Sequence, residues 1–257
     1  MSIHSTAIIE RGAELDPSVE VGPYAVIGPR VCIGPRTKIG PHAVLQGHTT
    51  IGADNQIFQF ASVGAIPQDL KYAGEPTRLE IGDGNQIREF ATLHLGTAGG
   101  GGLTRVGSKN LFMANSHVAH DCQIGDHVIL ANCASLGGHV QIEDGAIFGG
   151  LSAVHQFTRV GKLAFISGGA MVAQDVPPYC TVQGDRAQLI GLNTVGLTRA
   201  GLDDAAVRRM KRAYRIFFRS KLGLREAVAR VRAEYGGHPE IDHLVGFIEG
   251  SERGIAR

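Results

Sequence analysis

The residues best suited to chemistry lie in three short segments of the chain. HVAHDC covers residues 117–122, LGGH covers 136–139 and AVHQF covers 153–157. An imidazole titrates near neutral pH and can take a proton from a hydroxyl group, and a neighbouring carboxylate can hold its tautomer. A glycine leaves its backbone N–H open to a developing oxyanion. The candidates for such chemistry are His117, His120, Asp121, Gly138, His139, His155 and Gln156.

A six-residue period in the sequence brings these segments together. Apolar residues recur at every sixth position through 3–63, 81–93 and 106–172. Neither a helix nor an ordinary strand has this period, but a coil of three short strands does, with one six-residue unit on each side of a triangular prism. Glycine often follows the apolar residue, and we expect it to turn the chain at the corner. The period therefore predicts a mainly β protein, a parallel β-helix with 18 residues in each coil.

The length of the coil predicts which residues become neighbours. Val118, Leu136 and Val154 are 18 residues apart, so they should stack on one side of the prism, in coils about 4.8 Å apart. The residues after them then form columns: Gly137 with His155; His120 with Gly138 and Gln156; and Asp121 with His139. The sequence therefore predicts one cluster of imidazoles with a carboxylate and an amide.

The cluster has three interpretations. The chain has no GxSxG motif and no cysteine beside a histidine in a nucleophile motif, which favours direct attack by an acceptor hydroxyl with a general base. Alternatively, three histidines could hold zinc, as in a lyase of the carbonic anhydrase type. A third interpretation is the exposed polar face of a non-catalytic scaffold. Metal analysis of the purified protein separates the second interpretation from the first.

Two segments interrupt the period. Residues 66–78 (IPQDLKYAGEPTR) are polar and contain two prolines, and residues 96–104 (GTAGGGGLT) are rich in glycine. We expect both to loop out of the prism, and loops on a rigid scaffold often carry function. The period fades after Val172. We therefore predict a β-helical domain over 1–190 and a helical domain over 191–257.

The C-terminal domain should be α-helical and positively charged. Apolar stripes and a capping residue, Asp203, predict helices over 203–220, 224–235 and 239–250. Residues 203–235 contain ten Lys or Arg and four Asp or Glu, a net charge of +6, whereas the whole chain carries +1. This asymmetry predicts an acidic partner for the helices, with a merely solvated face as the alternative.

Composition excludes several classes of protein. A length of 257 residues with 43% hydrophobic residues allows one large core, and a net charge of +1 argues against nucleic-acid binding. None of the four cysteines forms a CxxC pair, so a disulfide framework or a thiolate zinc site is not expected. The N-terminus lacks the apolar run of a signal peptide, and no segment predicts a transmembrane helix. We therefore expect a cytoplasmic protein.

Several motifs resemble one family over almost the entire chain. They are QFASVG (59–64), QDLKYAGEPTR (68–78), GGGLTRVG (100–107), HVAHDC, AVHQF, VAQDVPPY (172–179) and the terminal SERGIAR. With them the chain resembles the acyl-[acyl-carrier-protein]–UDP-N-acetylglucosamine O-acyltransferases of lipid A biosynthesis. The resemblance implies a left-handed coil and transfer of a 3-hydroxyacyl group from acyl carrier protein to the glucosamine 3-hydroxyl of UDP-N-acetylglucosamine. It implies no cofactor, since the donor is carried on the phosphopantetheine of the carrier protein.

The resemblance also implies roles for individual residues. His120 matches the general base, Asp121 its partner and Gly138 the donor of the oxyanion N–H. The residues that match the lining of the cleft, or positions near the sugar and acyl chain, are His117, His139, His155, Gln156, Gln68, Asp69 and Lys71. Those that match nucleotide or phosphate contacts are His94, Asn193 and Arg199, and Gly168 matches the position that limits the acyl tail. Because a polar side of a prism cannot enclose a substrate alone, we expect a homotrimer with the cleft between subunits.

The chain departs from the family pattern at two positions. HLGT (94–97) stands where the family commonly has HRGT, and Ala200 stands where a second basic residue often follows the position of Arg199. Leu95 and Ala200 therefore remove positive charge near the expected diphosphate. Some relatives prefer a 3-amino analogue of the sugar and form an amide, and that acceptor stays open for this chain.

Overall fold

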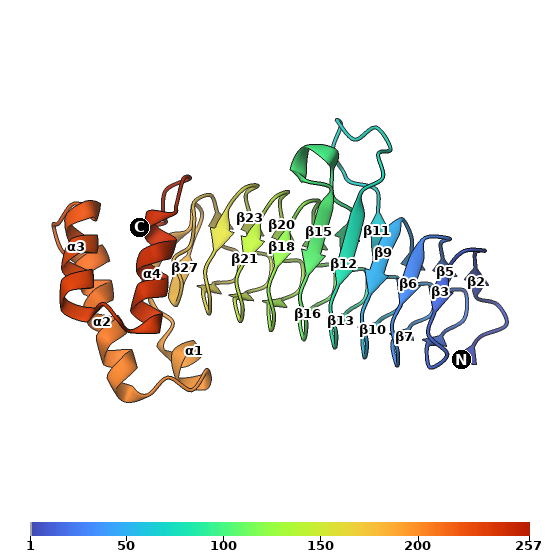
Figure 1. The fold of residues 1–257 in the computed structure, drawn as a ribbon, viewed down its shortest axis with the longest axis horizontal. Helices are drawn as coiled ribbons and strands as arrows, with labels where there is room; N and C mark the ends of the chain where they lie inside the picture. Colours follow the sequence, from blue (N-terminus) through green and yellow to red (C-terminus); the bar gives the residue numbers. More distant parts are fainter. Residues whose placement is uncertain (1) are drawn as a thin grey trace.

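The computed structural model describes residues 2–257. Short strands wind into a long parallel β-helix, and a group of helices closes its C-terminal end (Figure 1). The strands form three sheets, here called A, B and C, which are the three sides of the prism. Neighbours within each sheet come from successive coils, so every third strand along the chain lies in the same sheet.

Most strands are only two residues long, because the chain turns at a corner after each one. Sheet A contains β1 (Ser2–Ile3), β4 (Glu20–Val21), β7 (Lys38–Ile39), β10 (Gln56–Ile57), β13 (Gln86–Ile87), β16 (Leu111–Phe112), β19 (Ile129–Leu130), β22 (Ile147–Phe148), β25 (Phe165–Ile166), β27 (Cys180–Gln183) and β28 (Gln188–Leu192). Sheet B contains β2 (Ile8–Ile9), β5 (Val26–Ile27), β8 (Val44–Leu45), β11 (Ser62–Ala65), β14 (Thr92–His94), β17 (His117–Val118), β20 (Ser135–Leu136), β23 (Ala153–Val154) and β26 (Met171–Val172). Sheet C contains β3 (Glu14–Leu15), β6 (Val31–Ile33), β9 (His48–Ile51), β12 (Arg78–Ile81), β15 (Leu103–Val106), β18 (Gln123–Ile124), β21 (Gln141–Ile142) and β24 (Arg159–Val160).

The core is a column of apolar side chains inside the prism. Val118 pairs with Leu136, and Leu136 pairs with Val154, which confirms the expected 18-residue coil. Leu136 is 1% exposed and Leu45 and Phe112 are fully buried. The first coil is the exception, since it lies at the open N-terminal end: Ile3 is 39% exposed, and Ile9 and Leu15 are only partly buried. Burial of one such side chain contributes about 1.5–3 kcal/mol, so the stack of coils supplies most of the apolar stabilisation.

The role expected for the glycines was wrong. Within residues 2–257, Gly64 (φ 79°) is the one glycine directly after an inward apolar residue that has a positive φ. The corners are turned with positive φ by the third residues after the apolar position, such as Arg36 (φ 58°) and Phe60 (φ 62°). The glycines are required by close approach of the next coil. A Cβ on Gly34 would lie 2.7 Å from the carbonyl carbon of Gly52, and one on Gly40 would lie 2.7 Å from the backbone nitrogen of Gln59.

The two interruptions leave the prism on the same side, between β11 and β12 and between β14 and β15 (Figure 1). The second contains a short 3₁₀ helix, η1 (Ala98–Gly100). The two loops contact each other, because the Ala98 N–H donates to Glu75 Oε1 at 3.3 Å. The Arg78 N–H also donates to the Gly102 carbonyl at 2.9 Å. The two breaks in the period therefore form one connected structure.

A ladder of buried asparagines keeps the coils in register across both interruptions. Asn55 Oδ1 accepts from the backbone N–H of Asn85, 30 residues later, at 2.8 Å. Asn85 Oδ1 accepts from the N–H of Asn110, 25 residues later, at 2.9 Å. Asn110 Oδ1 accepts from the N–H of Val128 at the regular spacing of 18. Because Asn55, Asn85 and Asn110 are at most 1% exposed, each link is shielded from water.

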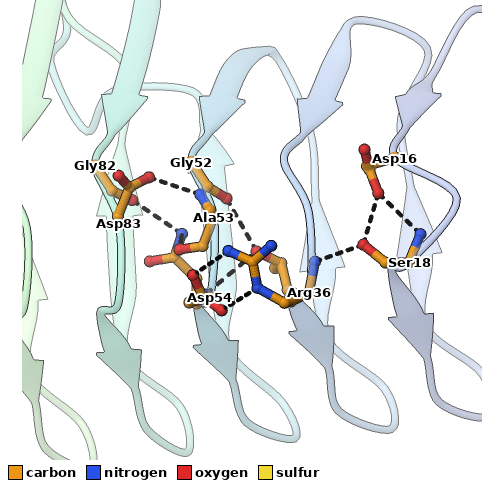
Figure 2. Close-up of polar contacts among 10 residues, drawn as sticks. Asp16, Ser18, Arg36, Gly52, Ala53, Asp54, Gly82 and Asp83 are labelled. Atoms are coloured by element: carbon orange, nitrogen blue, oxygen red, sulfur yellow. Dashed lines mark hydrogen bonds and ion pairs between the residues drawn. The ribbon is translucent and has the colours of Figure 1, made fainter.

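Polar side chains also connect the N-terminal coils at the surface (Figure 2). Arg36 donates to both carboxylate oxygens of Asp54 at 2.6 Å, and its N–H donates to Ser18 Oγ at 2.8 Å. The N–H of Ala53 donates to Asp83 Oδ1 at 2.7 Å. The side chains of Arg36 and Asp54 are 61% and 50% exposed, so this ion pair adds little to stability. The ion pair instead links the corners of two neighbouring coils.

The C-terminal region contains four α-helices: α1 (Thr194–Arg199), α2 (Asp204–Arg219), α3 (Leu224–Tyr235) and α4 (Pro239–Glu249). The three expected helices are confirmed to within one residue at each end, and Asp203 caps α2 as predicted. Helix α1 and the antiparallel pair β27–β28 were not expected, since the region has neither a six-residue nor a clear helical period. The division at residue 190 stays a prediction, because the terminal segment returns to the β-helix, where Ile255 pairs with Asp175. No helix among residues 2–257 is long and apolar enough to span a bilayer.

Candidate active site

His120 and Asp121 form the centre of the site. They lie directly after β17, at the corner between sheets B and C. His120 Nδ1 is 2.8 Å from Asp121 Oδ2. The carboxylate is the acceptor in this contact, so the ring carries its proton on Nδ1 and keeps Nε2 free to accept one. The His120 side chain is 13% exposed and that of Asp121 is 1% exposed, so the imidazole alone of the two has access to a substrate.

Asp121 is held from several directions. The N–H of Thr97 donates to Oδ1 at 2.8 Å, and Thr97 Oγ1 donates to Oδ2 at 2.6 Å. The backbone N–H of Asp121 donates to Thr104 Oγ1 at 2.8 Å, and the residue has a φ of 60°. Both threonines belong to the second interruption. Sequence reasoning missed them, although the break in the period beside a glycine-rich segment was the available signal.

Gly138 lies one coil above His120, as predicted. A Cβ at this position would lie 2.5 Å from Cε1 and 2.7 Å from Nε2 of His120, so only glycine leaves room for the ring. Among residues 2–257, the Gly138 N–H has no protein acceptor, whereas the N–H groups of Gly137 and His139 donate to backbone carbonyls. A free N–H beside the imidazole is the arrangement that an oxyanion donor requires.

His139 forms the wall of the cluster. Its ring stacks on Phe157 with centroids 4.2 Å apart, and meets the ring of His120 edge-on at 5.1 Å. His139 Nε2 is 3.8 Å from Asp121 Oδ2. Burial lowers the pKa of His139, while the carboxylates of Asp121 and Asp69 act in the opposite direction. The expected column of Asp121 and His139 is therefore confirmed.

His94 and His117 form a second imidazole pair on the neighbouring strands β14 and β17. Their rings meet edge-on at 4.9 Å, and His117 Nδ1 is 2.7 Å from Thr92 Oγ1. Burial lowers the pKa of both rings, that of His94 to about 4. His94 is 4% exposed and its Nδ1 has no partner among the described residues. A lowered pKa favours the neutral form of both rings at pH 7.

His155 and Gln156 are exposed on the next coil. His155 Nδ1 is 2.8 Å from Arg253 Nη2 and 3.0 Å from the Gln156 carbonyl oxygen. Arg253 also donates from Nε to the Ala173 carbonyl at 2.9 Å. His155 therefore contacts the C-terminal segment, and no hydrogen bond or ion pair joins it to His120 within residues 2–257. The sequence motif SERGIAR contained this arginine, but its link to His155 required the fold.

The remaining predicted residues lie around the cluster or apart from it. Gln68 and Lys71 are exposed on the first loop, where Asp69 Oδ1 accepts from the Lys71 N–H at 3.0 Å. Asn193 and Arg199 line a separate pocket of about 920 Å³ beside α1. Asn193 caps that helix through the Gly196 N–H and donates to the Leu163 carbonyl.

Gly168 lies after β25, at the corner between sheets A and B, and is exposed. A Cβ there would lie 3.4 Å from the Gly150 carbonyl, so its own chain tolerates a larger residue. The cluster, the pocket of Asn193 and the corner of Gly168 occupy different faces of one chain. The substrate-binding roles expected for these residues stay predictions.

The cluster also has the residue types of a metal site. One ligand atom each from His120, Asp121 and His139 lies within 4.8 Å of the others. Two ligands at about 2.0–2.1 Å from a tetrahedral zinc are roughly 3.3 Å apart. The 2.8 Å between His120 Nδ1 and Asp121 Oδ2 is shorter and has hydrogen-bond geometry. The arrangement therefore suits proton transfer better than metal ligation.

The chain is similar to known proteins over its full length. A family profile described as "Udp N-acetylglucosamine O-acyltransferase; Domain 2" matches residues 175–256, and the bacterial transferase hexapeptide profile matches 103–138. The acyl-[acyl-carrier-protein]–UDP-N-acetylglucosamine O-acyltransferase of Myxococcus xanthus is 62% identical over 255 residues, 99% of each chain. The enzyme of the same name from Anaeromyxobacter dehalogenans is 61% identical over all of both chains.

The chain belongs to the UDP-N-acetylglucosamine O-acyltransferase family. Solved structures of the family agree: LpxA from Acinetobacter baumannii superposes with a TM-score of 0.96 at 45% identity, covering 99% of each chain. LpxA from Moraxella catarrhalis gives 0.97 at 42% identity, covering 100% of each chain. The predicted family and the left-handed parallel β-helix with C-terminal helices are confirmed.

The two departures from the family pattern have structural counterparts. Leu95 is 4% exposed and lies against Gly47, where a Cβ would be 2.7 Å from a Leu95 methyl carbon. Leu95 therefore fills an apolar space beside His94. Ala200 ends α1 and lines the pocket of Asn193 and Arg199. The pocket keeps Arg199, Lys162 and His127 as its basic residues.

The buried His94 predicts a pH-dependent stability. Unfolded histidine has a pKa of about 6.5, whereas burial lowers the pKa of His94 to about 4. Between these two pKa values His94 is protonated in the unfolded state and neutral in the folded state. The free energy of unfolding therefore falls as the pH drops from about 6.5 towards 4, by up to roughly 3 kcal/mol. In His94→Gln this loss is absent, so the stability difference between wild type and variant should shrink at acidic pH.

Urea unfolding of both proteins at pH 7 and pH 4.5, at one protein concentration, measures this effect. Equal pH dependence in the two proteins would contradict the assignment.

Proposed function

We propose that this protein transfers a 3-hydroxyacyl group from acyl carrier protein to the glucosamine 3-hydroxyl of UDP-N-acetylglucosamine, the first step of lipid A biosynthesis. The observation that carries the proposal is full-length identity of 61–62% to relatives with that name, together with the hydrogen-bonded His120–Asp121 pair. The acyl group arrives on the phosphopantetheine of the carrier, so the reaction needs no other cofactor.

His120 is the general base in this proposal. Its Nε2 removes the proton of the 3-hydroxyl while the hydroxyl oxygen attacks the thioester carbonyl carbon. The carbonyl oxygen becomes an oxyanion and accepts from the Gly138 N–H. The intermediate then collapses, the C–S bond breaks, and the imidazolium returns its proton to the thiolate of phosphopantetheine. The Asp121 carboxylate, 2.8 Å from Nδ1, stabilises the imidazolium between these steps.

The cluster around the base is largely neutral. Burial lowers the pKa of His94, His117 and His139, so these rings are uncharged at pH 7. Such rings can offer hydrogen bonds to a sugar, and their lowered pKa makes them weak bases that compete little for the proton of the acceptor. Their mutual contacts instead form a rigid wall, since His139 stacks on Phe157 and His94 packs against His117.

Replacement of His120 tests the chemistry. His120→Ala should lower kcat at least about a hundredfold, because a positioned base contributes typically 10²–10⁴-fold. The KM values should change little, since the side chain borders the cleft and makes no contact inside the prism. His4→Ala is the matched control, because His4 is an exposed histidine in the first coil, outside the cluster, and should retain wild-type kcat.

Steady-state kinetics with acyl carrier protein thioesters and UDP-N-acetylglucosamine gives these values. Near wild-type kcat in His120→Ala, with turnover lost in His139→Ala or His155→Ala, would place the base on another coil.

The assembly proposed for the active protein is a homotrimer. Three observations support it. The histidine cluster borders open space, and the pocket of Asn193 and Arg199 lies on another face of the chain, so one substrate reaches both only between two copies. Large apolar side chains are also exposed on one edge of the prism, at the corner between sheets A and B. They are Tyr24 (57%), Phe60 (46%), Phe90 (53%) and Leu151 (67%).

Sedimentation equilibrium should therefore give three times the 27.2 kDa of one chain. The mass should persist at the micromolar concentrations used for assays, and activity should fall when dilution dissociates the trimer. A fully active monomer would refute the shared cleft, because a single chain would then complete the site.

The carrier protein is proposed to bind α2. Arg208, Lys211, Arg212 and Arg215 are exposed, are not in ion pairs among the described residues, and follow one face of the helix at spacings of three and four. Arg209, in contrast, is paired with Glu240 at 2.8 Å. A cationic face of this kind attracts an acidic partner and increases the rate of encounter.

Charge reversal on α2 tests the docking. Arg208→Glu combined with Arg212→Glu should raise the KM for the carrier thioester several-fold and leave the KM for UDP-N-acetylglucosamine unchanged, with the difference shrinking at high salt. The control is Arg11→Glu combined with Arg30→Glu, which changes the net charge equally at the opposite end of the molecule. Equal effects of the two pairs would show that only net charge matters.

A further inference from the structure

The glycine-rich interruption of the period has no role in the chemistry described so far. It includes η1 and lies between β14 and β15, beside the first loop (Figure 1). A surface insertion of this length costs little free energy and can be tolerated without a function. Here, however, it places the 5% exposed Thr97 against the carboxylate of Asp121.

The contacts of Thr97 cover both oxygens of that carboxylate. Its N–H donates to Oδ1 at 2.8 Å and its hydroxyl donates to Oδ2 at 2.6 Å. Oδ2 is also the atom that receives His120 Nδ1 at 2.8 Å. The hydroxyl of Thr97 therefore acts on the same oxygen that orients the imidazole.

The loop is shaped to fit this carboxylate. A Cβ on Gly100 would overlap the Asp121 carboxyl group, and one on Gly96 would lie 2.8 Å from Asp121 Oδ1. Thr104, at the other end of the loop, accepts from the Asp121 backbone N–H at 2.8 Å. The interruption thus holds the side chain and the main chain of Asp121, and the glycines allow the approach.

We propose that Thr97 is a positioning residue for His120, acting through the Asp121 carboxylate. This inference rests on the proposed role of His120 as the base. With the hydroxyl present, the carboxylate plane is fixed by one donor on each oxygen, and Oδ2 stays directed at Nδ1. Without the hydroxyl, the loop holds only Oδ1, and Oδ2 keeps only His120 Nδ1 as a hydrogen-bond partner, so the carboxylate and the imidazole can rotate together. The imidazole then spends less time with Nε2 directed at the acceptor hydroxyl.

The physical consequence is a loss in the chemical step and not in binding. Thr97 is buried behind Asp121 and does not itself reach the cleft, so its removal leaves the substrate contacts unchanged. A hydrogen bond to a charged group is among the stronger ones in proteins, and its loss corresponds to roughly tenfold or more. The backbone N–H contact persists in every variant of Thr97, so a partial loss is expected.

Isosteric replacement separates the hydroxyl from the shape of the side chain. Thr97→Val should lower kcat about tenfold with unchanged KM for both substrates, and Thr97→Ser should restore kcat to within about twofold. Thr158→Val is the matched control. Thr158 is also fully buried in the β-helix, but its hydroxyl has no partner among the described residues, so its replacement should leave kcat unchanged.

A second comparison tests whether Thr97 acts through Asp121. In an Asp121→Ala background, Thr97→Val should cause no further loss of kcat, because the group it positions is absent. Thermal unfolding and sedimentation of each variant report whether the fold and assembly are retained.

The outcomes distinguish this inference from the proposed function. Wild-type kcat in Thr97→Val, with His120→Ala inactive, would overturn the inference and leave the base in place. An equal loss from Thr97→Val with and without Asp121 would also overturn it, since the effect would then not pass through the carboxylate. Full activity in His120→Ala would instead overturn the proposed role of His120 as the base, on which this inference rests.

Discussion

The structure depends on one constraint: each coil must return the chain to the same hydrogen-bonding register as the coil before it. Strands of two residues make few hydrogen bonds each, so the sheets are stable only as a continuous stack. A slip of one residue would turn apolar side chains outward and polar ones inward. The regular spacing of 18 is therefore kept, and extra residues are accepted only as complete loops. The asparagine ladder keeps the register across these loops, since buried side-chain amides link residues that are 30 and 25 positions apart.

The same constraint builds the candidate site. His120 is on one coil and Gly138 and His139 are on the next, and their distances follow from the spacing of the backbone. The stack alone, however, would leave Asp121 at an exposed corner with an unrestrained carboxylate. The glycine-rich loop changes that, because Thr97 and Thr104 hold the residue from the side. The repeats thus place the residues of the cluster next to one another, and the loops that interrupt the repeats fix the orientation of the Asp121 carboxylate.

The two ends of the prism differ, because the C-terminal end is covered and the N-terminal end is open. At the C-terminal end, β27 and β28 change the sheet from parallel to antiparallel, and the helices cover the last coil. The terminal segment then returns along the β-helix, where Ser251 Oγ donates to the buried Asp175 and Arg253 reaches His155. An edge of paired strands that is covered in this way cannot add further strands. At the N-terminal end the first coil stays open, and Ile3 and Ile8 are 39% and 56% exposed.

The sequence alone determined the coil, the sheets and the columns of the cluster, because an apolar residue at every sixth position requires a backbone that repeats with the same period. It also determined α2, α3 and α4, whose apolar stripes and caps are local signals. It did not determine that residues such as Phe60 turn the corners with positive φ, because the reason for the glycines is the approach of the next coil. Only the tertiary structure decided that Thr97 holds Asp121 and that Arg253 contacts His155. Those pairs are 24 and 98 residues apart and belong to segments without a period, so no local pattern relates them.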